Sequence, residues 1–419
     1  MDKTVDAQIK LGKKDGFRFT ISYFLFSLLW MAGLAIIAAV LLPQHLRNVV
    51  GAEGSTAVFG VLNAATAITS LLSNLIVGNL SDRTRSRFGQ RTPWIVAGGV
   101  IGGVSLFAIG LFQNVWLIGV SYCISMIGLN MMIAPAMATL SDRVPENLRA
   151  TTSAFYSAGT TVGTSLGTLI GARFITLQTP GFITAGILMG IAGIAGIATV
   201  IVWPHERSAK SLPSVTGGVK ELLASFRPPL KGARDFWLAF TGRSLLIFSY
   251  YMILNYQLYI LLSYIGQSET AAAATISVMS IVTMVVGLVG SLVSGSLSDK
   301  FGRRKLPVNI ATLLMSIGFL LPWIMKSPFS MILFAGFSGL GYAVYGAVDQ
   351  ALNIDVLPNK NESGKDLGIL NMATTLGQTV GPIVTSILVG FGGYNLVFPT
   401  AVVFSALAMI FIQMIKSTK

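Results

Sequence analysis

Two ionisable side chains stand inside long apolar stretches of the sequence, Arg243 and Asp349. A charge is costly within a membrane-spanning helix, so each of them is a candidate functional residue. Asp349 lies six residues before Asp355, a depth of about 9 Å at the helical rise per residue. A carboxylate beside an arginine can hold a proton in one state and form an ion pair in another. A permanent ion pair that joins two helices is the equally weighted alternative.

Polar and aromatic residues in other apolar stretches are candidates for binding a substrate. Tyr251, Asn255 and Tyr259 recur every four residues, which predicts one stripe on a helix. Aromatic faces and amide groups suit an uncharged ligand rich in hydroxyl groups, although a tyrosine belt at the membrane surface would also explain Tyr259. The N-terminal half adds three candidates: Trp30, Asn63 and Asn130. Helix packing is the competing explanation for Trp30.

The elements that must position these residues follow from the composition. The 419 residues are 53% hydrophobic and only 11% charged, whereas about a quarter of a soluble domain is charged. The apolar stretches have the length of bilayer-spanning helices, and they lack the alternation of an outer-membrane barrel. A single cysteine and two loop histidines without ligand spacing indicate no disulfide and no metal site. We therefore predict an all-α integral membrane protein that is not an enzyme and needs no cofactor.

The apolar stretches predict twelve transmembrane helices. The first, which is too long for a cleaved signal peptide, is expected to be retained. The predicted spans are 19–42, 57–80, 93–112, 115–140, 150–174, 181–203, 236–263, 272–297, 307–325, 329–354, 366–391 and 394–415. The polar stretch 204–235 predicts a linker between two six-helix halves, 1–203 and 236–419.

The distribution of cations predicts the orientation. With both termini on one side, 25 of the 29 Lys and Arg residues lie on that side and three on the other. By the positive-inside rule, both termini are cytoplasmic. Because the excess of positive charge is explained by topology, it does not indicate a nucleic-acid partner.

A cationic loop occurs twice, once in each half. Gly78–Pro93 reads GNLSDRTRSRFGQRTP, and Gly295–Pro307 reads GSLSDKFGRRKLP. The aspartates Asp82 and Asp299 are 217 residues apart, and a second echo places Asp142 and Asp355 213 residues apart. Two echoes at nearly one offset indicate duplicated halves in parallel orientation.

This repeated loop resembles the signature of the major facilitator superfamily, and the resemblance covers the whole chain. The second copy matches the pattern at Gly295, Asp299, Lys300, Gly302, Arg303 and Arg304. The first copy matches at Gly78, Asp82 and Arg83, and four extra residues precede Gly89 and Arg91. This longer loop, with Leu129–Asp142 and Ala347–Pro358, resembles the glycoside–pentoside–hexuronide and sucrose-type porters. The chain departs from sodium-coupled and sucrose porters because spans one to six carry no carboxylate.

The resemblance implies that spans one, four, seven and ten line a central cavity, which Arg243 and Asp349 could both face. It also implies that Asp82 meets the start of span eleven and Asp299 the start of span five, where free backbone N–H groups attract an anion. These contacts would form a cytoplasmic latch, with Asp142 and Asp355 as further gate residues. The alternative is that the loops only set the topology.

The predicted function is proton-coupled uptake of a small uncharged polar solute, such as a sugar or glycoside, by alternating access. Sodium coupling is less favoured. Proton-driven efflux of a drug or amphipathic metabolite is the alternative function, and a sensor or lipid scramblase on the same scaffold is the alternative class. We expect a monomer in the cytoplasmic membrane whose partners are the small-molecule substrate and the lipid bilayer.

Overall fold

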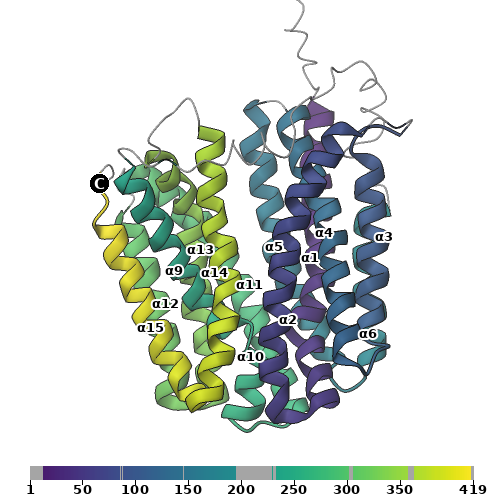
Figure 1. Ribbon diagram of the computed structural model, residues 1–419. Helices are drawn as coiled ribbons and strands as arrows, with labels where there is room; N and C mark the ends of the chain where they lie inside the picture. Colours follow the sequence, from purple (N-terminus) through teal and green to yellow (C-terminus); the bar gives the residue numbers. More distant parts are fainter. Residues whose placement is uncertain are drawn as a thin grey trace, which may run out of the picture. The chain divides into compact units, whose positions relative to one another are not determined.

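The computed structural model describes residues 13–84, 86, 88–144, 146–194, 229, 233–301, 305–356 and 363–416, and these residues are mainly helical. Within the described residues, one long or segmented helix corresponds to each of the twelve predicted spans, which confirms the predicted all-α fold (Figure 1). In the N-terminal half they are α1 (Lys13–Ile36) with the π-helical turn η1 (Ile37–Leu41), α2 (Leu42–Arg83), α3 (Thr92–Ile109), α4 (Val115–Arg143), α5 (Glu146–Arg173) and α6 (Gln178–Ile194).

The C-terminal half begins with a segmented helix made of α9 (Arg234–Leu254), α10 (Gln257–Tyr259) and the π-helical turn η3 (Ile260–Tyr264). It continues with α11 (Glu269–Phe301), α12 (Lys305–Met325), α13 (Pro328–Asp355), α14 (Ser363–Gly392) and α15 (Tyr394–Gln413). The predicted linker 204–235 lies outside the described residues except for 229 and 233–235.

Nine helical stretches among the described residues are long and apolar enough to cross a bilayer. One of them, Phe17–Gly78, contains the first predicted span and nearly all of the second. α5 is not among the nine, because Ser, Thr and Gly dilute its apolar residues. α6 is not among them because the structure describes only 17 of its residues, slightly fewer than a bilayer-spanning helix needs.

The connection between the first two spans differs from the predicted loop. The chain stays helical from Leu42 to Arg83 except at Gly51, where the backbone has φ 79° and ψ 172°. Glycine adopts positive φ without the steric cost of a side chain, so a single residue redirects the chain between the two spans. The segment after Leu41 is consequently an ordered helix that can make defined contacts.

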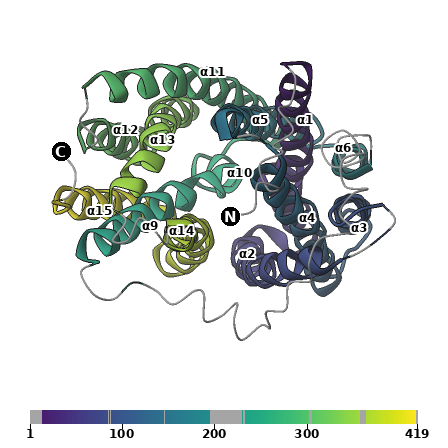
Figure 2. The same cartoon turned by 90° about the horizontal axis from the view of Figure 1, so that it is seen from above.

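The described chain divides into two compact units, and the division cuts through α2. The first unit comprises Met1–Leu41 and Ile68–Val215, and the second comprises Leu42–Ala67 and Thr216–Lys419. In the first unit α1 packs on α5 and α6, and α3 packs on α4 and α6. In the second unit α9 packs on α14 and α15, and α13 packs on α11 and α12 (Figure 2).

Four glycines of α5 let it approach α1 closely in the first unit. A Cβ atom added at Gly163 would lie 2.6 Å from the Leu28 carbonyl oxygen, and one at Gly171 would lie 3.0 Å from that of Ile36. Gly159 and Gly167 meet α1 in the same way, at Phe24 and Ala32. Glycines at this four-residue spacing therefore serve close helix packing in α5.

Replacing Gly167 by Ala is expected to destabilise the protein by about 1–3 kcal/mol, because the added methyl group overpacks the α1–α5 interface. Gly190→Ala in α6 is the matched control, since a Cβ atom there would meet nothing within 4 Å. Both changes replace a helical glycine by alanine, so they alter helix propensity alike. The difference between the unfolding temperatures of the two variants in detergent therefore measures the overpacking of α5 against α1. Equal stability of the two variants would contradict this assignment.

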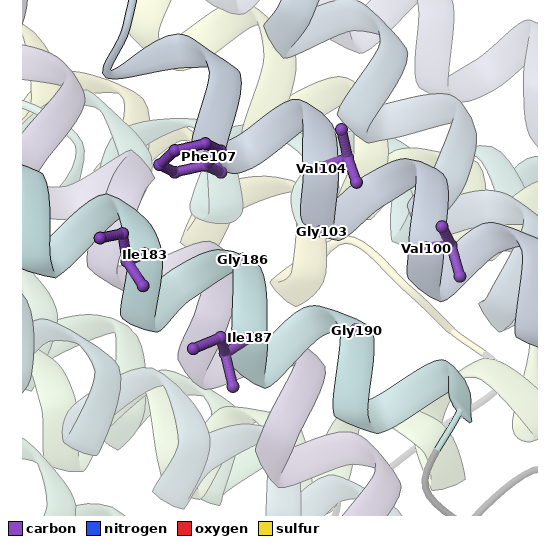
Figure 3. A pocket seen from close by; sticks show the side chains of 8 residues that line it. All are labelled: Val100, Gly103, Val104, Phe107, Ile183, Gly186, Ile187 and Gly190. Atoms are coloured by element: carbon purple, nitrogen blue, oxygen red, sulfur yellow. The ribbon is translucent and has the colours of Figure 1, made fainter.

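An apolar groove of about 350 Å³ lies between α3 and α6 (Figure 3). It is lined by Val100, Gly103, Val104, Phe107, Ile183, Gly186, Ile187 and Gly190. Several of these side chains are exposed on the surface of the first unit. Ligand sites normally include polar groups that orient the ligand, and this lining supplies only apolar side chains, so we do not assign the groove as a substrate site.

Candidate functional site

The two charges predicted within spans seven and ten meet in the second unit. The Nη1 atom of Arg243 on α9 lies 2.7 Å from the Oδ2 atom of Asp349 on α13. The side chains are only 8% and 4% exposed, respectively. The predicted proximity of the two residues is confirmed. Because a buried ion pair has lost its hydration, neither charge can lose its partner without a large free-energy cost.

Neighbouring hydroxyl groups extend the ion pair. The Nε atom of Arg243 donates a hydrogen bond of 2.9 Å to the Thr374 hydroxyl on α14. The Tyr345 side chain, one turn before Asp349 on α13, interacts electrostatically with the Asp349 carboxylate. Arg243 and Asp349 therefore form a centre that joins three helices, α9, α13 and α14.

A second polar cluster lies beside this centre and contains one predicted substrate residue, Tyr251. The Gln378 amide of α14 donates a hydrogen bond of 3.0 Å to the Tyr251 hydroxyl, and the side chains of Tyr251 and Tyr342 interact electrostatically. The Tyr342 ring stacks on Tyr250, with 4.7 Å between ring centroids and 13° between planes. Aromatic faces and amide groups thus lie next to the ion pair, the combination expected for a polar, uncharged ligand.

Local sequence explains why these side chains converge. Tyr342, Tyr345 and Asp349 are spaced at i, i+3 and i+7, so they share one face of α13. On α14, Gly377 and Gly381 allow a close approach to α9, because a Cβ atom at either would lie 2.8 Å from backbone atoms of that helix. The sequence-based prediction missed Tyr342, Tyr345, Thr374 and Gln378. Their spacing is the signal that could have found them. Tyr342 and Tyr345 share a face of α13 with Asp349, and on α14 Thr374 and Gln378 lie three residues before Gly377 and Gly381, respectively.

The predicted stripe of Tyr251, Asn255 and Tyr259 is wrong as a continuous helical face. α9 ends at Leu254, and the chain continues through the short α10 and the π-helical turn η3. The break after α9 and the π-helical turn η3 change the angle between successive side chains around the helix axis. As a result Tyr251 contacts α13 and α14, whereas the buried Tyr259 contacts the beginning of α2.

The beginning of α2 packs against the segment that follows α9, and we call this the α2–tyrosine contact. The Tyr259 hydroxyl donates to the carbonyl oxygens of Pro43, at 3.0 Å, and Ser55, at 3.3 Å. The Tyr256 hydroxyl donates to the Pro382 carbonyl oxygen at 3.0 Å. Both rings meet the Phe59 ring edge-on, with centroids 5.3 and 5.7 Å away. This burial favours a conformational role for Tyr259 rather than direct substrate binding.

The remaining substrate candidates lie in varied settings. Asn130 on α4 accepts a hydrogen bond from Asn74, at 3.0 Å, and donates one to Ser70, at 2.9 Å, both on α2. Its amide thus joins α2 to α4 in the first unit. Asn63 donates to the Phe59 carbonyl oxygen of its own helix, and Trp30 is 95% buried, with 5% exposed. Substrate binding by these three residues stays a prediction.

The structure describes the predicted gate residues only in part. Gly89 has φ 102°, a conformation that favours glycine, and Arg91 is buried. Arg83 is exposed at the end of α2, where Gly78 also lies. Asp82, Asp142, Gly295, Asp299, Lys300 and Asp355 lie in helices, but their side chains are outside the description, as are residues Gly302, Arg303 and Arg304 altogether. The cytoplasmic latch stays a prediction.

Within the described residues, no group of three or more His, Cys, Asp or Glu side chains could hold a metal ion. The polar chemistry of the site described above comes from one ion pair, tyrosine and threonine hydroxyls, and amides.

Comparison with known proteins identifies the family. The profile described as Major Facilitator Superfamily matches residues 19–286 and, in a second overlapping match, 244–418. The chain belongs to the Major Facilitator Superfamily. Membership places it among multi-pass membrane transporters, as the repeated loops indicated.

Several members of the superfamily resemble the chain individually. It is 26% identical over 399 residues to the lactose permease of Lactobacillus delbrueckii subsp. bulgaricus, covering 83% of this chain and 61% of that protein. The chain therefore spans less than two thirds of the length of that relative. It is 27% identical over 150 residues to an uncharacterised transporter of this superfamily from Escherichia coli, covering 36% of this chain and 37% of that protein.

Solved structures of the Major Facilitator Superfamily share the fold. The nucleoside transporter NupG superposes with a TM-score of 0.74 at 16% identity, covering 95% of this chain and all (100%) of that one. A bacterial homologue of the human lysosomal transporter Spinster, in an inward-facing and occupied conformation, gives 0.66 at 16% identity, covering 96% of both chains.

Proposed function

We propose that this protein is a secondary transporter that couples proton movement to the uptake of a small uncharged polar solute, such as a sugar or glycoside. The observation that carries the proposal is the buried ion pair of Arg243 and Asp349, which lies beside a cluster of tyrosine and glutamine side chains. The similarity to a lactose permease supports a sugar as the substrate.

Charge balance suggests how the ion pair would couple proton and solute. An unprotonated Asp349 neutralises Arg243, so the pair can stay buried. Proton uptake by Asp349 breaks the pair and leaves Arg243 with an unbalanced charge. The two protonation states therefore differ in net charge at one buried position. A coupled transporter switches between its inward-open and outward-open states only in certain combinations of protonation and substrate binding. Movement of the proton is then coupled to movement of the solute.

Alternating access would also require the α2–tyrosine contact to form and open. With both termini cytoplasmic, as the cation distribution predicts, this contact lies on the outer side of the membrane. In the described state, the hydroxyl groups of Tyr256 and Tyr259 are bonded to backbone carbonyl oxygens of α2, at Thr56 (3.5 Å) and Pro43 (3.0 Å) respectively. We propose that these bonds close the outer side, and that the cationic loops form the corresponding cytoplasmic latch.

Purified protein in proteoliposomes is expected to exchange labelled lactose or a related glycoside in counterflow and to accumulate it under an inward proton gradient. Accumulation should collapse on addition of a protonophore and should not respond to a sodium gradient. Protein-free liposomes are the control. Exchange of cationic dyes in place of sugars would support proton-driven efflux instead. Sugar exchange without any response to a proton gradient would refute the coupling.

A further inference from the structure

Arg243 is held from two sides by partners on different helices. Its Nη1 atom lies 2.7 Å from Asp349 on α13, and its Nε atom donates at 2.9 Å to the Thr374 hydroxyl on α14. The guanidinium group is planar and rigid, so two partners at different nitrogen atoms set both its position and its orientation. The Asp349 contact depends on the protonation state of that residue, whereas the Thr374 contact is with a hydroxyl that stays neutral.

The packing of α14 on α9 explains why Thr374 can reach Arg243. Thr374 precedes Gly377 by three residues and Gly381 by seven, so the three residues lie on one face of α14. A Cβ atom at Gly377 would lie 2.8 Å from the Ser244 carbonyl oxygen, next to Arg243 in the chain. The glycines bring this face of α14 against α9. The threonine side chain therefore spans only a short distance to the guanidinium group.

We propose that Thr374 is a positioning residue, which holds the Arg243 guanidinium beside Asp349 while the carboxyl group carries a proton. The ion pair then re-forms in the same geometry when the proton leaves. This inference rests on the proposed proton coupling and adds to it a role for α14. Removal of the Thr374 hydroxyl takes away one of the contacts that orient the Arg243 guanidinium beside a protonated Asp349.

Among the described side chains, the ionisable groups around Asp349 other than Arg243 are tyrosines. Tyr342 and Tyr345 of α13 and Arg243 of α9 act electrostatically on the site, and Tyr250 and Tyr251 of α9 adjoin Tyr342. α14 contributes Thr374 and Gln378, which do not titrate. Among the described side chains of α11 and α12, the ionisable ones are Glu269 and Lys305, which stand at the first residues of these helices. A pH response near neutrality at this site is thus assigned to Asp349 and its pairing with Arg243.

The test compares Thr374→Val, which removes the hydroxyl at nearly constant shape, with Thr374→Ser, which retains it. Proton-driven accumulation and counterflow of the exchanged sugar are measured in proteoliposomes between pH 5 and 9. We expect Thr374→Val to lower accumulation about tenfold more than it lowers counterflow, the effect of losing a hydrogen bond to a charged group. The alkaline limb of its pH profile should move to higher pH by about one unit, because the misplaced arginine pairs less well with the carboxylate.

Thr374→Ser is expected to restore the wild-type pH profile. Thr375→Val is the matched control, because the same change one residue further on lies about 100° around the helix. A wild-type pH profile in Thr374→Val would overturn the inference. So would equal losses in the Val and Ser variants, since the hydroxyl would then not matter.

Asp349→Asn separates this inference from the proposed function. If Asp349→Asn retains proton-driven accumulation with an unchanged pH profile, the proposed coupling fails and the role of Thr374 fails with it. If Asp349→Asn abolishes accumulation while Thr374→Val behaves as wild type, the coupling stands and the positioning role alone is overturned.

Discussion

Arg243→Gln is expected to destabilise the protein by about 3–5 kcal/mol, because it leaves the Asp349 carboxylate buried without its cation. The carboxylate lies in a position that is only 4% exposed, so water does not replace the lost partner. The variant should therefore unfold at a lower temperature in detergent. It should also lose proton-driven accumulation completely, because no ion pair can form when Asp349 releases its proton.

The double variant Arg243→Gln/Asp349→Asn should regain most of the lost stability. Both buried charges are then absent, and amides that hydrogen-bond to each other can replace the pair at little cost. Accumulation should stay absent, because the site no longer binds and releases a proton. Recovery of stability without recovery of coupling would separate the structural role of the pair from its proposed role in transport.

These outcomes are read from thermal unfolding and from proteoliposome accumulation of the same preparations. Asp235→Asn is a suitable control, since it removes a carboxylate at the first turn of α9, outside the predicted membrane interior. An Arg243→Gln variant as stable as the wild type would contradict the ion pair as a buried structural element. Proton-driven accumulation by the double variant would contradict the coupling mechanism.

Gly60→Leu is expected to prevent the α2–tyrosine contact from forming. A Cβ atom at Gly60 would overlap the Ser386 side chain of α14 and lie 3.3 Å from the Tyr256 hydroxyl. A leucine has no room between these groups, so α2 must move away from them. Overpacking of this kind typically costs about 1–3 kcal/mol. Because that cost applies only to the state with the contact closed, the population should shift to states in which it is open.

Thiol labelling can measure this shift. In a Cys123→Ser background, a cysteine replacing the fully buried Ser55 should react slowly with a maleimide and much faster when Gly60→Leu is added. Gly54→Leu is the matched control, because a Cβ atom at Gly54 meets only Val50 of its own helix, at 3.7 Å. Similar labelling rates in the two leucine variants would show that the contact does not depend on the space at Gly60.

The charged and small residues of the sequence were sufficient to predict much of the fold. The two cationic loops and their echoes indicated duplicated halves, and the apolar stretches indicated twelve helices. Both inferences rest on the cost of placing charges or unpaired backbone groups in lipid. That cost acts on each segment by itself, so a single sequence reveals it. The resemblance to the superfamily added that Arg243 and Asp349 could face one central cavity, and the structure places them in an ion pair.

The path of span seven could not be predicted in the same way. Periodicity assumes a regular helix, and the break between Leu254 and Gln257, followed by the π-helical turn η3, rotates Tyr259 away from Tyr251. The hydrogen bonds of the two tyrosines go to different helices. Such irregular turns are stabilised by partners that lie far away in the sequence, so local spacing does not reveal them.

The sequence by itself determined that this chain is a duplicated twelve-helix membrane protein of the Major Facilitator Superfamily with one buried pair of opposite charges. Only the tertiary structure decided what surrounds that pair: Thr374 and Gln378 from α14, and Tyr342 and Tyr345 from α13. It likewise decided that the beginning of α2 packs on Tyr256 and Tyr259. Burial and helicity follow from the local free energy of transfer into lipid. The choice of hydrogen-bond partners depends instead on helix–helix distances, which glycines such as Gly60 and Gly377 set by shape rather than by chemical character.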